Sequence, residues 1–81
     1  MMKLINRGSK QSPLARRACE SALAAHHEKF GDYGRQKHRT NYTVVVDGIK
    51  VTVEVVNRAT SYVATAMIGV RRLRNLPVQT H

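Results

Sequence analysis

The clearest alternation of apolar and polar positions in the chain is in YTVVVDGIKVTVEVV, residues 42–56. Apolar side chains occupy every second position on both sides of Asp47-Gly48, which is the spacing of β-strands with one buried face. A two-residue Asp-Gly connection favours a type I′ turn. The segment therefore predicts a β-hairpin. Its cross-strand pairs are Val46–Ile49, Val44–Val51 and Tyr42–Val53.

A third strand is predicted from SYVATAMI, residues 61–68, which follows the loop NRAT. A loop with an even number of residues places Ala64 and Ala66 on the buried face, whereas an odd number turns Val63, Thr65 and Met67 inward, because a one-residue shift reverses the faces. We favour the even loop, since small side chains allow a helix to approach closely. A four-residue loop pairs Val55 with Tyr62, Val53 with Ala64 and Val51 with Ala66. The predicted buried face then contains Tyr42, Val44, Val46, Ile49, Val51, Val53, Val55, Tyr62, Ala64, Ala66 and Ile68.

A helix is predicted over Pro13–Phe30, within SPLARRACESALAAHHEKFG. Ser12 is a typical N-cap, Pro13 suits the first helical position, and Gly31 suits the C-cap. Apolar and small residues recur with helical spacing along one side, while the opposite side is mixed in charge. The predicted buried stripe is Leu14, Ala15, Ala18, Cys19, Ala22, Ala25, His26 and Phe30, with Leu23 at its border.

The predicted fold class is α+β, with one long N-terminal helix packed on a three-stranded antiparallel meander and a short basic C-terminal segment. A chain of 81 residues has room for one domain only. Residues 1–11 are expected to form a basic, partly mobile arm. Residues 12–76 are expected to form a single α-β-β-β domain, and residues 77–81 a tail.

The second face of the predicted sheet is neither plainly polar nor plainly apolar. One helix covers only one face of a three-stranded sheet, so this face would be open in a monomer. Scattered valines on a surface need no functional explanation. Alternatively, the face is a docking surface for another protein or a second copy of the chain. The candidate protein-interface residues are Val45, Val56, Val63 and Met67.

The net charge of the chain indicates which class of partner is favoured. The chain carries 14 Lys and Arg against five Asp and Glu, a formal net charge of +9. Such an excess favours a polyanionic partner, above all nucleic acid. The alternative is that the basic clusters are solvated charge runs without a partner. The candidate nucleic-acid-binding residues are Arg35, Lys37 and Arg39 before the first predicted strand, Arg71, Arg72 and Arg74 after the third, and Lys3, Arg7 and Lys10 as an adjunct arm.

Residues for catalysis or metal binding are sparse. Cys19 and His26 are expected on the same side of the helix, but a zinc site needs four ligands and His38 is the only other internal candidate. Cys19 is therefore interpreted as a small buried apolar residue. The acidic residues form no paired site. The sequence predicts no enzyme activity, no cofactor and no metal.

The sequence also bears on the compartment. No apolar run approaches the roughly 20 residues of a membrane span, and the N-terminal segment lacks the apolar core of a signal peptide. A single Cys cannot form an internal disulfide. These features predict a cytoplasmic protein without membrane contact.

Two long segments resemble a known group of proteins. KLINRGSKQSPLARRACESALAAHHEKFGDYGRQK and VVDGIKVTVEVVNRATSYVATAMIGVRRLRNLP are similar to small uncharacterised proteins of lambda-like temperate phages and enterobacterial prophages, a family of unknown function. The resemblance implies the cytoplasm of a bacterial host and an accessory, early role. It supplies no binding residues.

These observations together predict a non-enzymatic phage or prophage accessory or regulatory protein that contacts nucleic acid through its basic clusters. The alternative is an inhibitor or modulator of a host protein that docks through the open sheet face. A homodimer formed through that face is the third interpretation.

Overall fold

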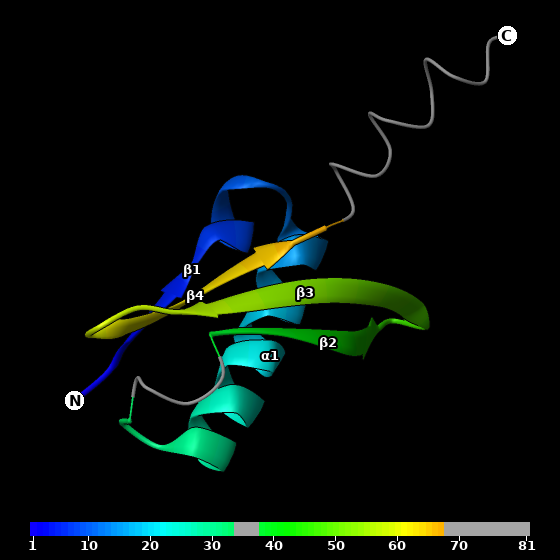
Figure 1. Cartoon of the computed structure of the whole chain (residues 1–81). Coiled ribbons are helices and arrows are strands. Elements are labelled where there is room, and N and C mark those ends of the chain that lie inside the picture. The colour runs from blue at the N-terminus through cyan, green and yellow to red at the C-terminus, as the bar shows by residue number, and fades with distance from the viewer. Residues whose placement is uncertain (34–37, 68–81) are drawn as a thin grey trace, which may run out of the picture.

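The computed structural model describes residues 1–33 and 38–67 (Figure 1). The elements are β1 (Lys3–Asn6), the 3-10 helix η1 (Arg7–Lys10), α1 (Pro13–Phe30), β2 (Arg39–Val46), β3 (Ile49–Asn57) and β4 (Ser61–Ala66). The strands form one four-stranded sheet in the order β1-β4-β3-β2, and α1 lies across one of its faces. The fold is α+β, with a single α-helix among the described residues.

The predicted three-stranded antiparallel meander is wrong, because the sheet has a fourth strand and is mixed. β1 pairs in parallel with β4, from Lys3↔Ser61 to Asn6↔Ala64. The segment expected to be a mobile arm therefore contributes an edge strand and η1. Four residues with two apolar side chains are too short to show a period. The partner of β1 lies near the other end of the described chain, so no local pattern indicates the pairing.

The β2–β3 hairpin has the predicted register. Val46 pairs with Ile49, and the ladder continues through Val44↔Val51 and Tyr42↔Val53. Asp47 and Gly48 have φ angles of 51° and 79°. Positive φ at both central positions is what a type I′ turn requires, and Gly and Asp tolerate it better than most residues.

The β3–β4 ladder has the predicted faces but not the predicted register. Val53 pairs with Ala66 rather than Ala64, and Val55 pairs with Ala64 rather than Tyr62. β3 runs on to Asn57, and the Arg58 N–H donates to the Ser61 carbonyl at 2.7 Å, so the turn is tighter than a four-residue loop. A shift of two residues leaves the same side chains inward. Ile68, also predicted to face inward, lies outside the described residues.

α1 has the predicted boundaries and caps. The Ser12 Oγ accepts from the Ala15 N–H at 3.1 Å, and the Gly31 N–H donates to the His27 carbonyl at 2.7 Å. The buried stripe differs from the prediction at Ala25, which is exposed, while Leu23 is buried. Leucine removes more apolar surface from water than alanine does, so this orientation of the helix is the more favourable one.

The core lies between α1 and the sheet. The central side chains are fully buried valines and alanines, and the partly buried Tyr42 and Val44 pack at the margin of the core. Ile49, which was expected to be buried, is half exposed beside the hairpin turn. Met2, which precedes β1, is also buried and belongs to the core. The fully buried sheet residues are Val51, Val53, Val55, Tyr62, Ala64 and Ala66.

Candidate nucleic-acid interface

The face of the sheet that points away from α1 is here called the open face. It consists of the strand positions that alternate with the buried ones, since successive side chains point to opposite sides. In β1 the alternation is supported by Asn6, whose Nδ2 donates to the Arg16 carbonyl of α1 at 2.9 Å, so Ile5 must face the other way. The open face contains Lys3, Ile5, Arg39, Asn41, Thr43, Val45, Lys50, Thr52, Glu54, Val56, Ser61, Val63 and Thr65, with Met67 just beyond the end of β4.

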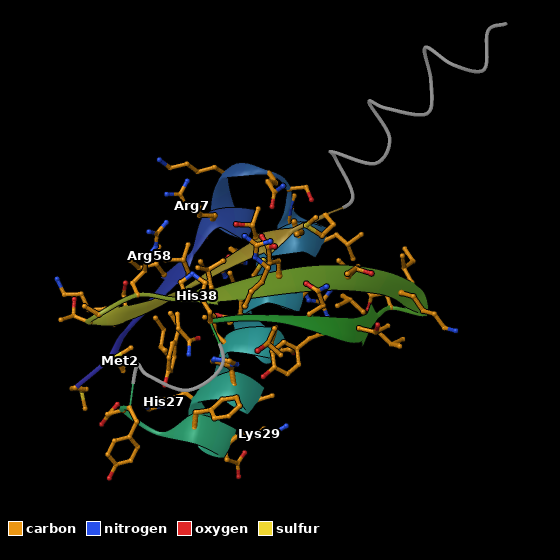
Figure 2. All side chains as sticks on the ribbon, in the orientation of Figure 1. Met2, Arg7, His27, Lys29, His38 and Arg58 are labelled. Atoms are coloured by element: carbon orange, nitrogen blue, oxygen red, sulfur yellow. The ribbon has the colours of Figure 1, made fainter. Side chains whose placement is uncertain are left out.

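Basic side chains surround this face. Lys3, Arg39 and Lys50 belong to it through strand alternation, and all three are exposed. Arg58 follows the buried Asn57 at the β3–β4 turn, and Arg7 follows β1. Figure 2 shows Arg7 and Arg58 both on the β1–β4 side of the molecule, away from Lys29 on the helix.

The open face carries little negative charge to offset these cations. Glu54 is its one carboxylate in the part of the chain that the structure describes. Glu54 is already paired, because the Arg39 Nε lies 3.1 Å from its Oε2. The remaining cations of the open face therefore produce a net positive field on one side of the sheet.

The outer face of α1 is more balanced. It carries Arg16, Arg17 and Lys29, but also Glu20 and Glu28. The Arg17 Nη1 makes an exposed ion pair of 2.8 Å with the Asp47 Oδ2. The two sides of the molecule thus differ in charge although both are exposed.

Of the predicted nucleic-acid-binding residues, Arg39 lies on the open face. Its side chain is 63% exposed even though it pairs with Glu54. The adjunct residue Lys3 lies on this face in β1, and the adjunct residues Arg7 and Lys10 belong to η1, which follows β1. The other predicted residues, Arg35, Lys37, Arg71, Arg72 and Arg74, lie outside the described residues.

The four predicted protein-interface residues share the open face but are spread along it. Val56 and Val63 are direct cross-strand partners near the middle, and both are partly buried. Val45 lies toward the hairpin turn and is 61% exposed. Met67 follows β4, and its N–H donates to the Thr52 carbonyl at 2.9 Å.

Ile5 is a neighbour of these valines that the sequence interpretation missed. It pairs with Val63 and is 40% exposed, so the apolar row extends across β1, β4 and β3. The signal in the sequence was the apolar pair at positions 4 and 5. That signal becomes useful only once the parallel pairing of β1 is known.

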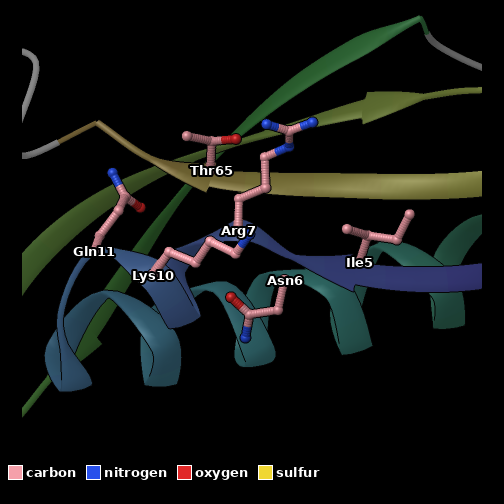
Figure 3. A pocket seen from close by; sticks show the side chains of 6 residues that line it. All are labelled: Ile5, Asn6, Arg7, Lys10, Gln11 and Thr65. Carbon is pink, nitrogen blue, oxygen red and sulfur yellow. The ribbon is translucent and has the colours of Figure 1, made fainter.

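A hollow lies where β1 leaves the sheet and η1 begins. β1 pairs with β4 only as far as Ala64, and beyond it the Gln11 side chain takes the place of a strand. The Gln11 Nε2 donates to the Ala66 carbonyl at 2.9 Å, and its Oε1 accepts from the Ala66 N–H at 3.1 Å. The hollow has a volume of about 420 Å³ (Figure 3). Its lining consists of Ile5, Asn6, Arg7, Lys10, Gln11 and Thr65.

On the covered side, both ring nitrogens of His26 have hydrogen-bond partners. The His26 Nε2 lies 2.8 Å from the Asn57 Oδ1, which can only accept, so Nε2 carries the proton. The His26 Nδ1 then accepts from the Tyr42 hydroxyl at 2.6 Å. Burial lowers the pKa of His26, against the opposing effect of the Asn57 hydrogen bond. This pairing makes His26 a neutral structural residue of the core.

Cys19 belongs to the same buried layer. Its side chain is fully buried beside Gly8, and burial raises the pKa of its thiol. A raised pKa disfavours the thiolate that a nucleophile or a metal ligand needs. Among residues 1–33 and 38–67, no three His, Cys, Asp or Glu side chains gather in a group that could hold a metal ion. No helix in these ranges is long and apolar enough to cross a membrane.

Fold and surface define a small α+β protein with one helix-covered and one open, basic sheet face. A family model described as "Protein of unknown function (DUF4060)" matches residues 4–78, and the chain belongs to that family. No curated protein and no solved structure matches the chain.

Proposed function

We propose that the protein is a non-enzymatic accessory or regulatory protein of a temperate phage or prophage that contacts nucleic acid in the cytoplasm of the bacterial host. The proposed contact is supported by the positive charge of the open face. This face has several exposed cations and, among the described residues, one carboxylate, Glu54, which is already paired with Arg39. The phage setting rests on the sequence resemblance. Two basic clusters would add phosphate contacts. The first is Arg35, Lys37 and Arg39, and the second is Arg71, Arg72 and Arg74.

The chemistry of the open face favours contact with the sugar-phosphate backbone. Neighbouring strands lie about 4.8 Å apart, so the face spans roughly 14 Å from β1 to β2. In the described part of the chain this face has no aromatic side chain on which bases could stack; Tyr42 and Tyr62 both face the helix. Contacts to phosphates position a nucleic acid but do not read its sequence. We therefore expect binding with little sequence preference and a steep dependence on salt.

The experiment measures binding of labelled duplex DNA, single-stranded DNA and RNA by fluorescence anisotropy over a range of salt concentrations. Lys3→Gln/Arg58→Gln removes two cations at the β1–β4 side of the open face. The matched control is Arg16→Gln/Lys29→Gln, which removes the same charge from the outer face of α1. For a duplex, each lost phosphate contact should lower the slope of log affinity against log salt by about 0.9.

We expect the open-face variant to lose up to about two such contacts and the control to lose none. Equal effects of the two variants would contradict the assignment to this face. Absence of binding to all three nucleic acids at low salt would refute the proposed function.

A second function, inhibition or modulation of a host protein, is favoured by the apolar row of Ile5, Val63 and Val56 across the open face. Such a row is of use to a protein partner and of little use to phosphates. Val63→Lys separates the two functions, because the added charge disrupts an apolar interface while supporting binding to nucleic acid. Sedimentation of wild type and Val63→Lys would also test the homodimer.

A further inference from the structure

The hollow beside η1 is built on a firmly placed turn. A Cβ added at Gly8 would lie 2.5 Å from the Ala15 carbonyl oxygen and 2.8 Å from the Cys19 Sγ, so η1 is packed directly on α1. The Gly8 carbonyl accepts from the N–H groups of Gln11 and Ser12 at 2.9 and 3.2 Å. The bonds from Gln11 to Ala66 attach the end of this turn to β4. The backbone that carries Arg7 and Lys10 is therefore held on two sides.

The lining of the hollow has the chemistry of an anion site. Arg7 and Lys10 supply two exposed cations, and the lining contains no carboxylate. Figure 3 shows the Arg7 guanidinium and the Thr65 side chain on the same side of β4, opposite α1. The Thr65 hydroxyl is a further donor there. A guanidinium and a hydroxyl are groups that commonly bind phosphate oxygens.

One acidic residue lies near enough to oppose an anion. Glu54 is the cross-strand partner of Thr65. Its carboxylate is held 3.1 Å from the Arg39 Nε, which partly neutralises it. Removing the charge of Glu54 should therefore strengthen anion binding at the hollow, which makes this residue a sensitive reporter of the site.

We propose that this hollow is a binding site for one phosphate group, with Arg7 and Lys10 as its cations and the Thr65 hydroxyl as its neutral donor. Its volume also admits part of a sugar attached to the phosphate. The phosphate of a nucleic-acid backbone and that of a free phosphate compound share this chemistry. Where the phosphate belongs to a nucleic acid, the inference rests on the proposed function. The hollow is then the place beside the open face where the protein contacts the nucleic-acid backbone most closely.

The test uses the full chain in two titrations, one with pyrophosphate and one with a short DNA duplex, both at constant ionic strength set with chloride. Amide chemical shifts in NMR spectra report which residues respond. Thr65→Val removes the hydroxyl without changing charge or the branched shape of the side chain. Thr52→Val is the matched control, because Thr52 lies on the same face, on β3 opposite Thr43 and away from the hollow.

We expect Thr65→Val to weaken pyrophosphate and duplex binding by about threefold to tenfold, which corresponds to the typical net free energy of one hydrogen bond in water. Thr52→Val should have no effect. Arg7→Gln/Lys10→Gln should weaken pyrophosphate binding more than tenfold, and Lys3→Gln/Arg58→Gln far less. Glu54→Gln should strengthen both interactions.

The outcomes distinguish the phosphate site from the proposed function. Suppose that the duplex binds, that Thr65→Val has no more effect on affinity than Thr52→Val, and that the Arg7/Lys10 and Lys3/Arg58 double variants weaken binding equally. The phosphate site is then refuted, while nucleic-acid contact stands. If no nucleic acid binds but pyrophosphate shifts the amides of residues 7–11 and 65, the proposed function fails and the site serves free phosphate compounds. If pyrophosphate shifts neither the amides of residues 7–11 nor that of residue 65, the site is refuted whether or not nucleic acid binds.

Discussion

The two faces of the sheet differ in what they require of a side chain. On the covered face, Val51, Val53 and Val55 are fully buried, and each contributes apolar area to the core. On the open face, the valines of the same hairpin range from the partly buried Val56 to Val45, which is 61% exposed. Folding thus depends on the first set, while the second set and its surrounding cations are not needed to form the core. A surface that folding does not require is where binding residues are best sought.

The faces also differ in how they treat polar groups. On the covered side the ring nitrogens of His26 both have protein partners, and the Tyr62 hydroxyl donates to the Gly31 carbonyl at 2.7 Å. A buried polar group without a partner is costly, which favours such pairing, although the buried Thr40 Oγ1 and Asn57 Nδ2 on this side have no hydrogen-bond partner. On the open side the cations remain in water and reach a partner without that cost. The same hydrogen-bonding chemistry therefore maintains the fold on one side and is available for binding on the other.

The largest expected difference comes from truncating neighbouring valines of β3. Val55 faces the core and Val56 faces the open side, so the two positions differ in burial but not in residue type or strand. Val55→Ala should lower the free energy of unfolding by about 2 kcal/mol, and Val56→Ala by less than about 1 kcal/mol. Urea unfolding followed by circular dichroism measures both values. Equal losses would show that a partner covers the open face in solution.

The next effect is a pH dependence that arises on the covered side. The pKa of His26 is lowered by burial from its ordinary value of 6.5, so the folded state binds fewer protons than the unfolded state near that pH. The contribution of His26 to stability is fully present above about pH 6.5 and is lost progressively as the pH falls below it. Unfolding midpoints in urea should therefore decrease from neutral toward mildly acidic pH.

His26→Gln provides the control for this pH dependence. Glutamine keeps a donor and an acceptor for Asn57 and Tyr42 but does not titrate, so the variant should be less stable at neutral pH and should show a shallower pH dependence. An unchanged slope in this variant would assign the effect to other groups.

The smallest expected effect is at the exposed ion pair between Arg17 and Asp47, which connects the helix to the hairpin turn. Both side chains are more than half exposed, at 53% and 66%. Asp47→Asn removes the charge, while asparagine is well suited to the positive φ of this turn. The free energy of unfolding should change by less than about 1 kcal/mol, and the change should vanish at high salt. A larger loss would show that the pair is needed to hold the helix on the sheet.

The sequence predicted those parts of the fold that depend on local spacing. The helix boundaries, both helix caps and the β2–β3 register follow from residues close together in the chain, and all agree with the structure. For the third predicted strand, now β4, the sequence predicted correctly which side chains face inward, but the predicted pairing with β3 differs from the observed register by two residues. The alternation determines the faces, whereas the length of the β3–β4 turn depends on how far β3 continues.

The candidate site was predictable only in part. The excess of Lys and Arg indicates a polyanionic partner. Arg39 was expected just before the first strand of the hairpin, and the structure places it as the first residue of β2. The sequence indicated Arg7 as part of a basic arm but not its place beside the open face, and it indicated neither the position of Ile5 nor the hollow beside them. They reach the open face through the parallel pairing of β1 with β4, a contact between segments far apart in the chain.

The sequence alone therefore determined the helix, the hairpin, the inward faces of three strands and the basic character of the protein, because each depends on spacing or composition that can be read within a short window. Only the tertiary structure decided the fourth strand, the order β1-β4-β3-β2 and the attachment of Gln11, just after η1, to Ala66. Parallel strands need a long crossover connection, so β1 and β4 come from distant parts of the chain, and no short window of the sequence shows that they meet.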